Sequence, residues 1–302
     1  MSASSEAVDT EPKTTVIDGI KETTEWIEND NRSFYIHRYA PETQPVATLT
    51  IVHGLGEHID RYSALARGFA QSGIEVLGFD QRGFGKTGRR CGRLGDNEGI
   101  DCVACDISFM NDLVAKPDVP HFLFGHSMGG LNVLNYALNH NDDKIRGVIS
   151  SAPALKAGKP LLPPGIVVTA LHQVARVFPS IQKNTGITLD MLTSNQGEIE
   201  KFNASVENIG HCTLGTLSSI IKRGDAVIKD AAKFNTPVYL VHADGDQATD
   251  IQGTREFFNA LPDSLDKQFR EVKDNVYHEL HFEEDLDFDL LDTYVQWILS
   301  RI

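Results

Sequence analysis

The segment FLFGHSMGGLNVL, from Phe122 to Leu134, places one serine between a hydrophobic run and a helix-like pattern. Ser127 has Gly125 two residues before it and Gly129 two residues after it. A helix N-cap would explain the serine but not the glycines on both sides. A strained turn from a strand into a helix explains all three, because its crowded backbone leaves no room for side chains beside the serine. We therefore interpret Ser127 as a candidate nucleophile.

The composition of the 302-residue chain is that of a globular protein, with 41% hydrophobic and 23% charged residues. A net charge of −14 argues against nucleic acid as a partner and against electrostatic docking on anionic lipid. No apolar run approaches the roughly 20 residues that span a bilayer, and the polar N-terminal sequence holds no hydrophobic core of a secretory signal. Four cysteines do not make a disulfide scaffold. We therefore expect a cytoplasmic protein.

Hydrophobic strands alternate with helical patterns along most of the chain. Strands are predicted over residues 46–54, 74–80, 121–125, 145–153, 236–243 and 267–272. This alternation predicts an α/β protein with a mostly parallel central sheet and helices on both of its faces. The alternation stops after Pro153, where a proline-led apolar pattern from Val167 to Phe178 predicts a helical insertion above the sheet.

Two motifs point to a cofactor or a metal, but each is incomplete. GFGKTG, Gly83 to Gly88, follows a strand, yet the glycine-rich and charged RRCGRLGDNEG after it is predicted not to form the helix that a dinucleotide site needs. We expect this loop to be a structural connector in which Asp80 and Arg82 can pair. Cys102 and Cys105 lack a second ligand pair, so packing on one helix face is expected rather than zinc binding. No cofactor and no metal is expected.

A serine hydroxyl attacks efficiently only when a histidine takes its proton and an acid orients that histidine. With a strand-to-helix elbow, the acid and then the histidine follow the serine, each in a loop at the end of a strand. The acid candidates after the strand 236–243 are Asp244, Asp246 and Asp250. The histidine candidates after the strand 267–272 are His278 and His281.

Backbone N–H groups must also stabilise the oxyanion that forms when a serine attacks an ester. One donor is expected from Met128, which directly follows the candidate nucleophile. The second is expected from Leu55 in HGLG, His53 to Gly56, because this glycine-rich loop follows an early strand.

These motifs together resemble the monoacylglycerol lipases of the α/β-hydrolase superfamily, from about residue 25 to the end of the chain. GHSMGG marks the superfamily, whereas HGLGEHIDRY and YHELH are similar to the monoglyceride lipase group, and DQRG is more similar to fungal members. The resemblance implies an α/β-hydrolase fold with a helical cap. We predict a flexible tail over 1–24, core parts over 25–153 and 226–302, and the cap over 154–225.

The resemblance also implies roles for individual residues. Ser127 matches the nucleophile, Asp246 the orienting acid, with Asp244 as its close competitor, and His278 the base; Leu55 and Met128 match the oxyanion donors. The residues that match those holding the glycerol end are Glu57, Arg61 and His281. A local ion pair and a surface histidine are the alternative interpretation of that last set.

The implied reaction is the hydrolysis of monoacylglycerol to fatty acid and glycerol through a serine ester. The cap lacks the usual Asp-Pro and has Phe202 there, and Ala243 stands where glycine is usual, so the alcohol half of the substrate stays open. Related carboxylesterase, lysophospholipase, thioesterase and acyltransferase activities, or a non-catalytic ligand receptor of the same fold, are the alternatives. The apolar cap is expected to contact a membrane or a lipid droplet.

Overall fold

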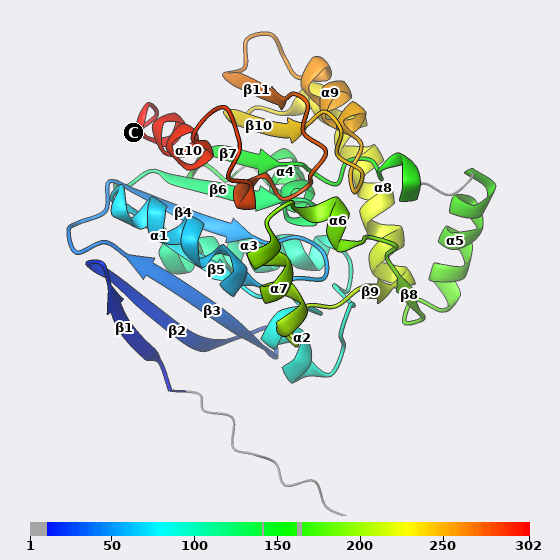
Figure 1. Ribbon diagram of the computed structural model, residues 1–302, viewed down its shortest axis with the longest axis horizontal. Helices are drawn as coiled ribbons and strands as arrows, with labels where there is room; N and C mark the ends of the chain where they lie inside the picture. The colour runs from blue at the N-terminus through cyan, green and yellow to red at the C-terminus, as the bar shows by residue number, and fades with distance from the viewer. Residues whose placement is uncertain (1–10, 141, 162–164) are drawn as a thin grey trace, which may run out of the picture.

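A computed structural model describes residues 11–140, 142–161 and 165–302. Within these residues, nine strands form one sheet in the order β1-β2-β3-β5-β4-β6-β7-β10-β11 (Figure 1). Their bounds are β1 (Lys13–Ile17), β2 (Ile20–Asn29), β3 (Arg32–Ala40), β4 (Ala47–Val52), β5 (Ile74–Phe79), β6 (His121–His126), β7 (Ile145–Ser151), β10 (Val238–Ala243) and β11 (Lys267–Val272). Strands β1, β2, β3 and β5 pair antiparallel, and every pair from β5 to β11 is parallel. The predicted mostly parallel sheet is confirmed.

Helices cover both faces of this sheet. Their bounds are α1 (Ser63–Gln71), α2 (Gly85–Cys91), α3 (Ile100–Val114), α4 (Met128–Asn139), α5 (Gly165–Val177), α6 (Leu189–Leu192), α7 (Gln196–Ala204), α8 (Leu214–Asp230), α9 (Ile251–Ala260) and α10 (Leu290–Leu299). On β6, Phe122 and Phe124 pack in the cluster that includes α1 and α10, whereas Leu123 packs in the cluster that includes α3, α4, α8 and α9. Because β6 is buried on both faces, its central residues Phe122, Leu123 and Phe124 form an unbroken apolar run.

No helix of the described residues is long and apolar enough to cross a bilayer.

The prediction of a flexible tail is wrong for the part of it that the structure describes. Residues 13–24 form β1 and the first half of β2, which pair from Lys13 with Thr24 to Ile17 with Ile20. Asp18 and Gly19 connect the strands with φ angles of 51° and 78°, and such an Asp-Gly turn is a hairpin signal. The prediction was based on the polar composition of the segment and did not take the Asp-Gly turn into account. Residues 1–10 of the predicted tail lie outside the described residues.

The prediction for the glycine-rich connector is also wrong in part, because α2 forms over Gly85–Cys91. A Cβ atom on Gly88 would lie 2.4 Å from the carbonyl carbon of Gly83, so glycine permits this compact start. Gly88 lies inside the helix and does not open it, which differs from a dinucleotide site. Asp80 and Arg82 do not pair with each other. Asp80 accepts from the backbone N–H groups of Ile59 and Lys86, and Arg82 pairs with Asp106 and Glu98.

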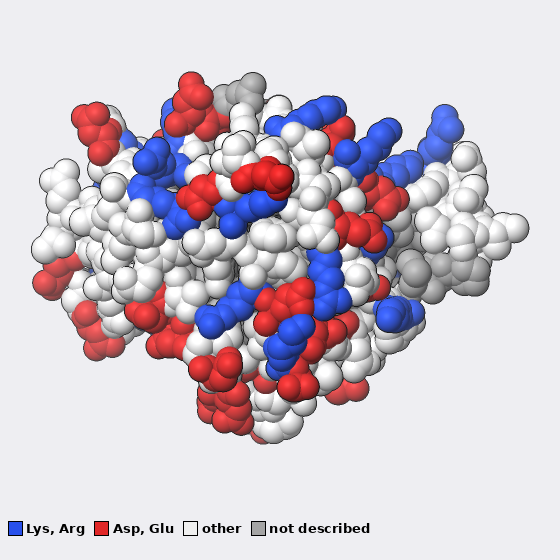
Figure 2. All heavy atoms as spheres, turned by 90° about the horizontal axis from the view of Figure 1, so that it is seen from above, with Lys and Arg blue, Asp and Glu red and all other residues white. Residues whose placement is uncertain are grey.

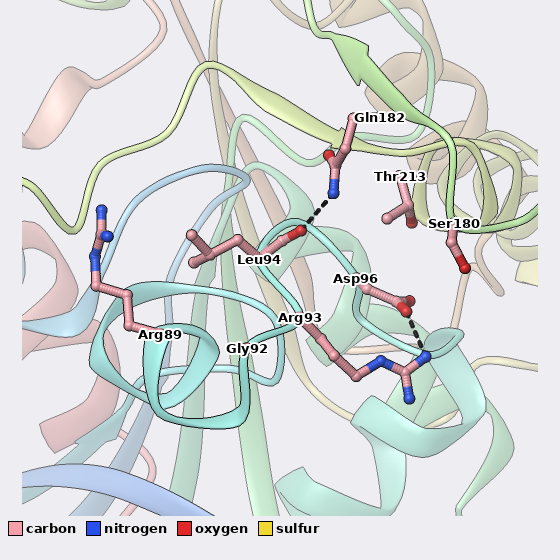
Figure 3. Close-up of a pocket in the computed structure, with 8 residues that line it drawn as sticks. All are labelled: Arg89, Gly92, Arg93, Leu94, Asp96, Ser180, Gln182 and Thr213. Atoms are coloured by element: carbon pink, nitrogen blue, oxygen red, sulfur yellow. Dashed lines mark hydrogen bonds and ion pairs between the residues drawn. The ribbon is translucent and has the colours of Figure 1, made fainter. Parts of the chain in front are cut away.

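The loop after α2 joins the core to the segment that was predicted as the cap. Between β7 and β10 lie α5 to α8 and a small antiparallel sheet of β8 (Gln182–Asn184) and β9 (His211–Thr213), which are separated in the chain by α6 and α7. Gln182 donates to the carbonyl of Leu94 (2.8 Å), and the N–H of Thr213 donates to the carbonyl of Gly95 (2.9 Å). Figure 3 shows the pocket at this junction, which contains none of the predicted site residues. The predicted boundary at residue 225 falls within α8.

Four short 3-10 helices complete the fold of the described residues: η1 (Ile59–Tyr62), η2 (Lys159–Leu161), η3 (Ala231–Lys233) and η4 (Leu280–Phe282). On α3, Cys102 is half-buried and Cys105 is exposed, and both thiols are free. The expected packing of both cysteines on one helix face is therefore wrong for Cys105.

Candidate active site

Ser127 lies at the turn between β6 and α4, with φ 56° and ψ −119°. A positive φ is strained for a residue with a side chain. Hydrogen bonds hold this conformation on both sides. The N–H of Ser127 donates to the carbonyl of Ser151 (3.0 Å), and its carbonyl accepts from the N–H groups of Leu131 (3.0 Å) and Ala154 (2.9 Å). Hydrogen bonds to β7, to α4 and to the segment after β7 therefore hold Ser127 in its strained conformation.

The glycines around Ser127 are required by close backbone contacts. A Cβ atom on Gly125 would lie 2.3 Å from the carbonyl oxygen of Gly129, and one on Gly129 would lie 2.0 Å from the carbonyl oxygen of Val52. Both separations are far below van der Waals contact, and the opposing atoms belong to the backbone. The turn therefore needs glycine at both positions, as the strained-turn interpretation requires.

Asp246 and His278 come together from the loops after β10 and β11. The Nδ1 atom of His278 lies 2.6 Å from Oδ2 of Asp246. The other oxygen of Asp246 accepts from the backbone N–H groups of Ala248 (2.8 Å) and Thr249 (3.0 Å). Of the competing acids, Asp250 caps α9 by accepting from the N–H of Gln252. The side chain of Asp246 is fully buried. Because two backbone N–H groups of the same loop donate to it, this loop fixes the direction of the carboxylate.

Charges and hydrogen bonds shift the pKa values of this pair in opposite directions. Burial opposes ionisation of Asp246, but the imidazoles of His278 and His242 outweigh it and hold the pKa of the carboxyl well below its usual range. Burial likewise opposes protonation of His278, yet the Asp246 carboxylate raises the pKa of this histidine above its ordinary value. The pair thus favours an ionised Asp246 and an imidazole ready to accept a proton.

The second ring nitrogen of His278, Nε2, is free to accept a proton. Its Nε2 atom is buried and has no hydrogen-bond partner among the described residues. The ring of His278 lies 4.6 Å from that of His126, the residue that precedes Ser127. Because Nδ1 is held by Asp246, Nε2 is the atom available to take a proton at the elbow.

The glycine-rich loop after β4 lies against the same elbow. A Cβ atom on Gly54 would lie 3.2 Å from Cβ of Ser127, which places the loop containing Leu55 beside the serine. Oε1 of Glu57 accepts from the N–H of Gly54 (2.6 Å) and holds this loop. Met128 is the first residue of α4, where the N–H groups lack intrahelical partners. Met128 thus directly follows Ser127, and Leu55 follows Gly54, the residue that lies against the serine.

Glu57 and Arg61, which were predicted to hold the alcohol end of a substrate, belong to a buried ion-pair cluster with Glu279. Arg61 donates to Glu57 Oε2 (2.5 Å) and, with two nitrogens, to Glu279 (2.6 and 2.8 Å). Its guanidinium also lies over the rings of Phe202 (4.9 Å) and Phe282 (4.8 Å). Although burial opposes ionisation, Arg61 lowers the pKa of Glu57. The alternative interpretation of a local ion pair therefore describes Arg61 accurately.

His281, the third residue of that predicted set, is not a surface histidine. Both of its ring nitrogens are buried without a hydrogen-bond partner among the described residues, as is Nδ1 of His126. Its ring stacks on Tyr62 at 5.0 Å and lies 4.9 Å from the ring of His126. The structure thus brings His281 to the serine elbow with free polar atoms.

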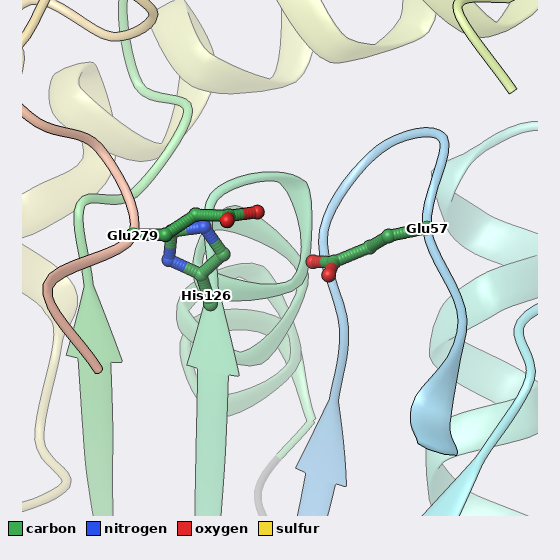
Figure 4. Close-up of side chains that lie close together, drawn as sticks. All are labelled: Glu57, His126 and Glu279. Atoms are coloured by element: carbon green, nitrogen blue, oxygen red, sulfur yellow. The ribbon is translucent and has the colours of Figure 1, made fainter. Parts of the chain in front are cut away.

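Within the described part of the chain, one group of side chains has the spacing of a metal site: Glu57, His126 and Glu279, whose ligand atoms lie within 4.8 Å of one another. Figure 4 shows the two carboxylates reaching from separate loops toward His126 at the end of β6. Both carboxylates already bind Arg61, so the ion-pair cluster accounts for their arrangement.

Sequence reasoning did not identify Glu279, His126 or His242 as part of the site. Glu279 and His126 adjoin candidate residues in the chain, and this adjacency was the available signal. His242 lies within β10, where a buried histidine gives no periodic pattern.

Comparisons with known proteins agree with this architecture. The family model Hydrolase_4, described as serine aminopeptidase, S33, matches residues 43–285. An abhydrolase domain-containing protein of Dictyostelium discoideum is 29% identical over 274 residues, which are 91% of this chain but only 28% of that protein. A monoacylglycerol lipase of Mycolicibacterium smegmatis is 26% identical over 268 residues, 87% of this chain and 92% of that protein. The crystal structure of Paleococcus ferrophilus monoacylglycerol lipase has a TM-score of 0.78 and 26% identity, and covers 89% of this chain and 99% of that chain.

The family match includes the serine elbow and the loops after β4, β10 and β11. The prediction of an α/β-hydrolase related to monoacylglycerol lipases is confirmed. This chain belongs to the serine aminopeptidase S33 family of α/β-hydrolases.

Proposed function

We propose that this protein is a serine ester hydrolase that cleaves monoacylglycerols to fatty acid and glycerol through an acyl-Ser127 intermediate. The observation that carries the proposal is the contact of 2.6 Å between Asp246 and His278, with the free Nε2 of His278 beside the strained turn at Ser127. The relatives named as monoacylglycerol lipases support the substrate class.

In the proposed first step, Nε2 of His278 takes the proton of Ser127 as Oγ attacks the ester carbonyl. Asp246 keeps the remaining proton on Nδ1 and stabilises the imidazolium. The N–H groups of Leu55 and Met128 stabilise the oxyanion, and each such donor contributes roughly 10²- to 10³-fold to kcat. His278 then protonates the departing glycerol oxygen, and a water molecule activated by the same histidine releases the fatty acid.

We further propose different roles for the three residues matched to the glycerol-holding set. His281 is the candidate partner for a glycerol hydroxyl, because both of its nitrogens are buried and free. Glu57 supports the oxyanion loop through Gly54, and Arg61 holds Glu57 in place. This division differs from a direct contact of all three side chains with the substrate.

The segment over residues 154–225 is proposed to be a cap that contacts a lipid surface through α5. Several apolar side chains of this helix and the residues after it are exposed, including Ile166 (81%), Val177 (68%) and Phe178 (58%). The lobe that contains α5 stands apart from the sheet in Figure 1 and is mostly free of charged groups in Figure 2. An amphipathic helix of this kind binds in the interfacial region of a bilayer, which would deliver a poorly soluble substrate.

A fluorophosphonate probe tests the nucleophile. We expect the wild-type protein to be labelled at Ser127 and Ser127→Ala to remain unlabelled. Failure to label the wild-type protein, or equal labelling of both proteins, would refute a serine hydrolase.

A substrate panel tests the ester class. Monoacylglycerols of increasing chain length should be hydrolysed in preference to diacylglycerols, lysophospholipids, acyl-CoA and short aryl esters. A preference for short, water-soluble esters would contradict the lipase assignment and favour a carboxylesterase.

A further inference from the structure

His242 is a second histidine at the candidate acid. It lies near the end of β10 and is completely buried. Its Nε2 atom is 3.2 Å from Oδ2 of Asp246, the same oxygen that contacts Nδ1 of His278 at 2.6 Å. The carboxylate of Asp246 is therefore shared by two imidazoles from different strands and loops.

The neighbours of His242 define which of its nitrogens carries a proton. Nε2 faces two groups that only accept hydrogen bonds, the carboxylate of Asp246 and the backbone carbonyl of Thr249 (3.3 Å), and it also lies 3.2 Å from the hydroxyl of Thr249. That hydroxyl donates to Oδ2 of Asp246 (3.0 Å). A proton on Nε2 therefore satisfies both acceptors and leaves the hydroxyl bound to the carboxylate. Nδ1 lies 2.8 Å from the hydroxyl of Thr254 on α9, which can donate to it. This contact anchors the ring between the strand and the helix.

We propose that His242 is a positioning residue, whose Nε2–H donates to Oδ2 of Asp246 and limits how much of the carboxylate's charge acts on His278. The inference rests on the proposed role of His278 as the base. Because a carboxylate with an additional donor is a weaker base, the proton on Nδ1 of His278 stays on that histidine and Nε2 keeps its direction toward Ser127.

Loss of this donor has a definite sign. The charge of Asp246 would act more strongly on His278, so the pKa of His278 would rise and the base would remain protonated to higher pH. Of the other ionisable groups around His278, Glu57 and Glu279 favour its protonation. His126 and His281 repel His278 when the rings are protonated, and Arg61 opposes the protonation of both of these neighbours. A substitution at position 242 removes none of these ionisable groups.

The test compares variants that keep or lose the donor. His242→Met fills similar space without a donor, and His242→Asn retains an amide at the position of Nδ1, near Thr254, without reaching Asp246. His242→Gln places an amide N–H near the position of Nε2. We expect the acid limb of kcat/KM to move to higher pH in the Met and Asn variants, with roughly tenfold lower kcat/KM at neutral pH, the size of one hydrogen bond to a charged group. His242→Gln should restore the wild-type profile.

His121→Met is the matched control, because His121 is also a buried strand histidine that binds threonine hydroxyls, those of Thr48 and Thr50. We expect this variant to lose stability without a change in the pH profile. An unchanged acid limb in whichever of His242→Met and His242→Asn folds would overturn the inference. If the wild-type protein itself shows no esterase activity and no labelling of Ser127, the proposed function is refuted instead.

Discussion

Substitution of Arg61 by methionine tests whether the buried cluster is structural. Methionine keeps much of the apolar contact with the neighbouring rings but removes the cation that two carboxylates share. The exposed fractions of the three side chains are 7% for Arg61, 4% for Glu57 and 3% for Glu279. Water therefore has little access to replace the lost hydrogen bonds.

The magnitude follows from this burial. Removing one partner of a buried ion pair costs about 3–5 kcal/mol of unfolding free energy, because the other charge is left uncompensated. Arg61 serves Glu57 and Glu279 together, so a loss near the upper end, about 5 kcal/mol, is expected. In the variant, burial without a cation raises the folded-state pKa of both carboxyls above their unfolded values. Stability should therefore recover as pH falls through those raised pKa values.

The assay is denaturant unfolding at neutral and mildly acidic pH. Arg255→Met is the matched control, because Arg255 makes a two-nitrogen contact with Glu271 (both 2.8 Å) at a more exposed position. The expected loss for this control is about 1 kcal/mol or less. Adding Glu279→Gln to Arg61→Met should recover part of the loss, since it removes one unpaired buried charge.

Three results would refute this reasoning. The first is a loss for Arg61→Met no larger than that of the control, and the second is a loss that does not diminish at lower pH. The third is unchanged stability with a raised KM for monoacylglycerols, which would mean that Arg61 contacts the substrate directly.

Four further predictions concern catalysis, packing, pH and the lipid surface. Asp246→Asn should lower kcat by roughly 10⁴-fold because the imidazole takes the wrong tautomer, and an equal loss in Asp244→Asn would contradict the assignment. Gly129→Ala should cost about 1–3 kcal/mol of unfolding free energy or more, and slow fluorophosphonate labelling, because its Cβ meets a backbone carbonyl; wild-type stability and labelling would count against the strained turn. The kcat/KM of the wild-type protein should fall as pH decreases through the raised pKa of His278, and a flat profile would exclude this base. Phe178→Glu should reduce hydrolysis of monoacylglycerol in vesicles but not of a soluble ester, and equal effects on both would contradict surface docking by α5.

The fold could be predicted where neighbouring residues determine it. Alternating strands and helices, with β-branched residues in the strands, were sufficient for the parallel part of the sheet. The antiparallel hairpin of β1 and β2 was missed because β1 is exposed and the polar sequence up to the start of β2 resembles a tail in composition. The short helix α2 was missed because its glycines count against a helix in general, although close backbone packing requires them here.

The sequence by itself determined the turn at Ser127, because all its requirements lie within the thirteen residues of FLFGHSMGGLNVL. It also limited the acid to three aspartates and the base to two histidines. Only the tertiary structure decided that Asp246 contacts His278, that His242 shares this carboxylate, and that Arg61 binds Glu279. The physical reason is that these contacts join loops up to 218 residues apart. Which residues form these contacts depends on how the ends of the strands are arranged at the edge of the sheet. A local sequence pattern does not contain this information.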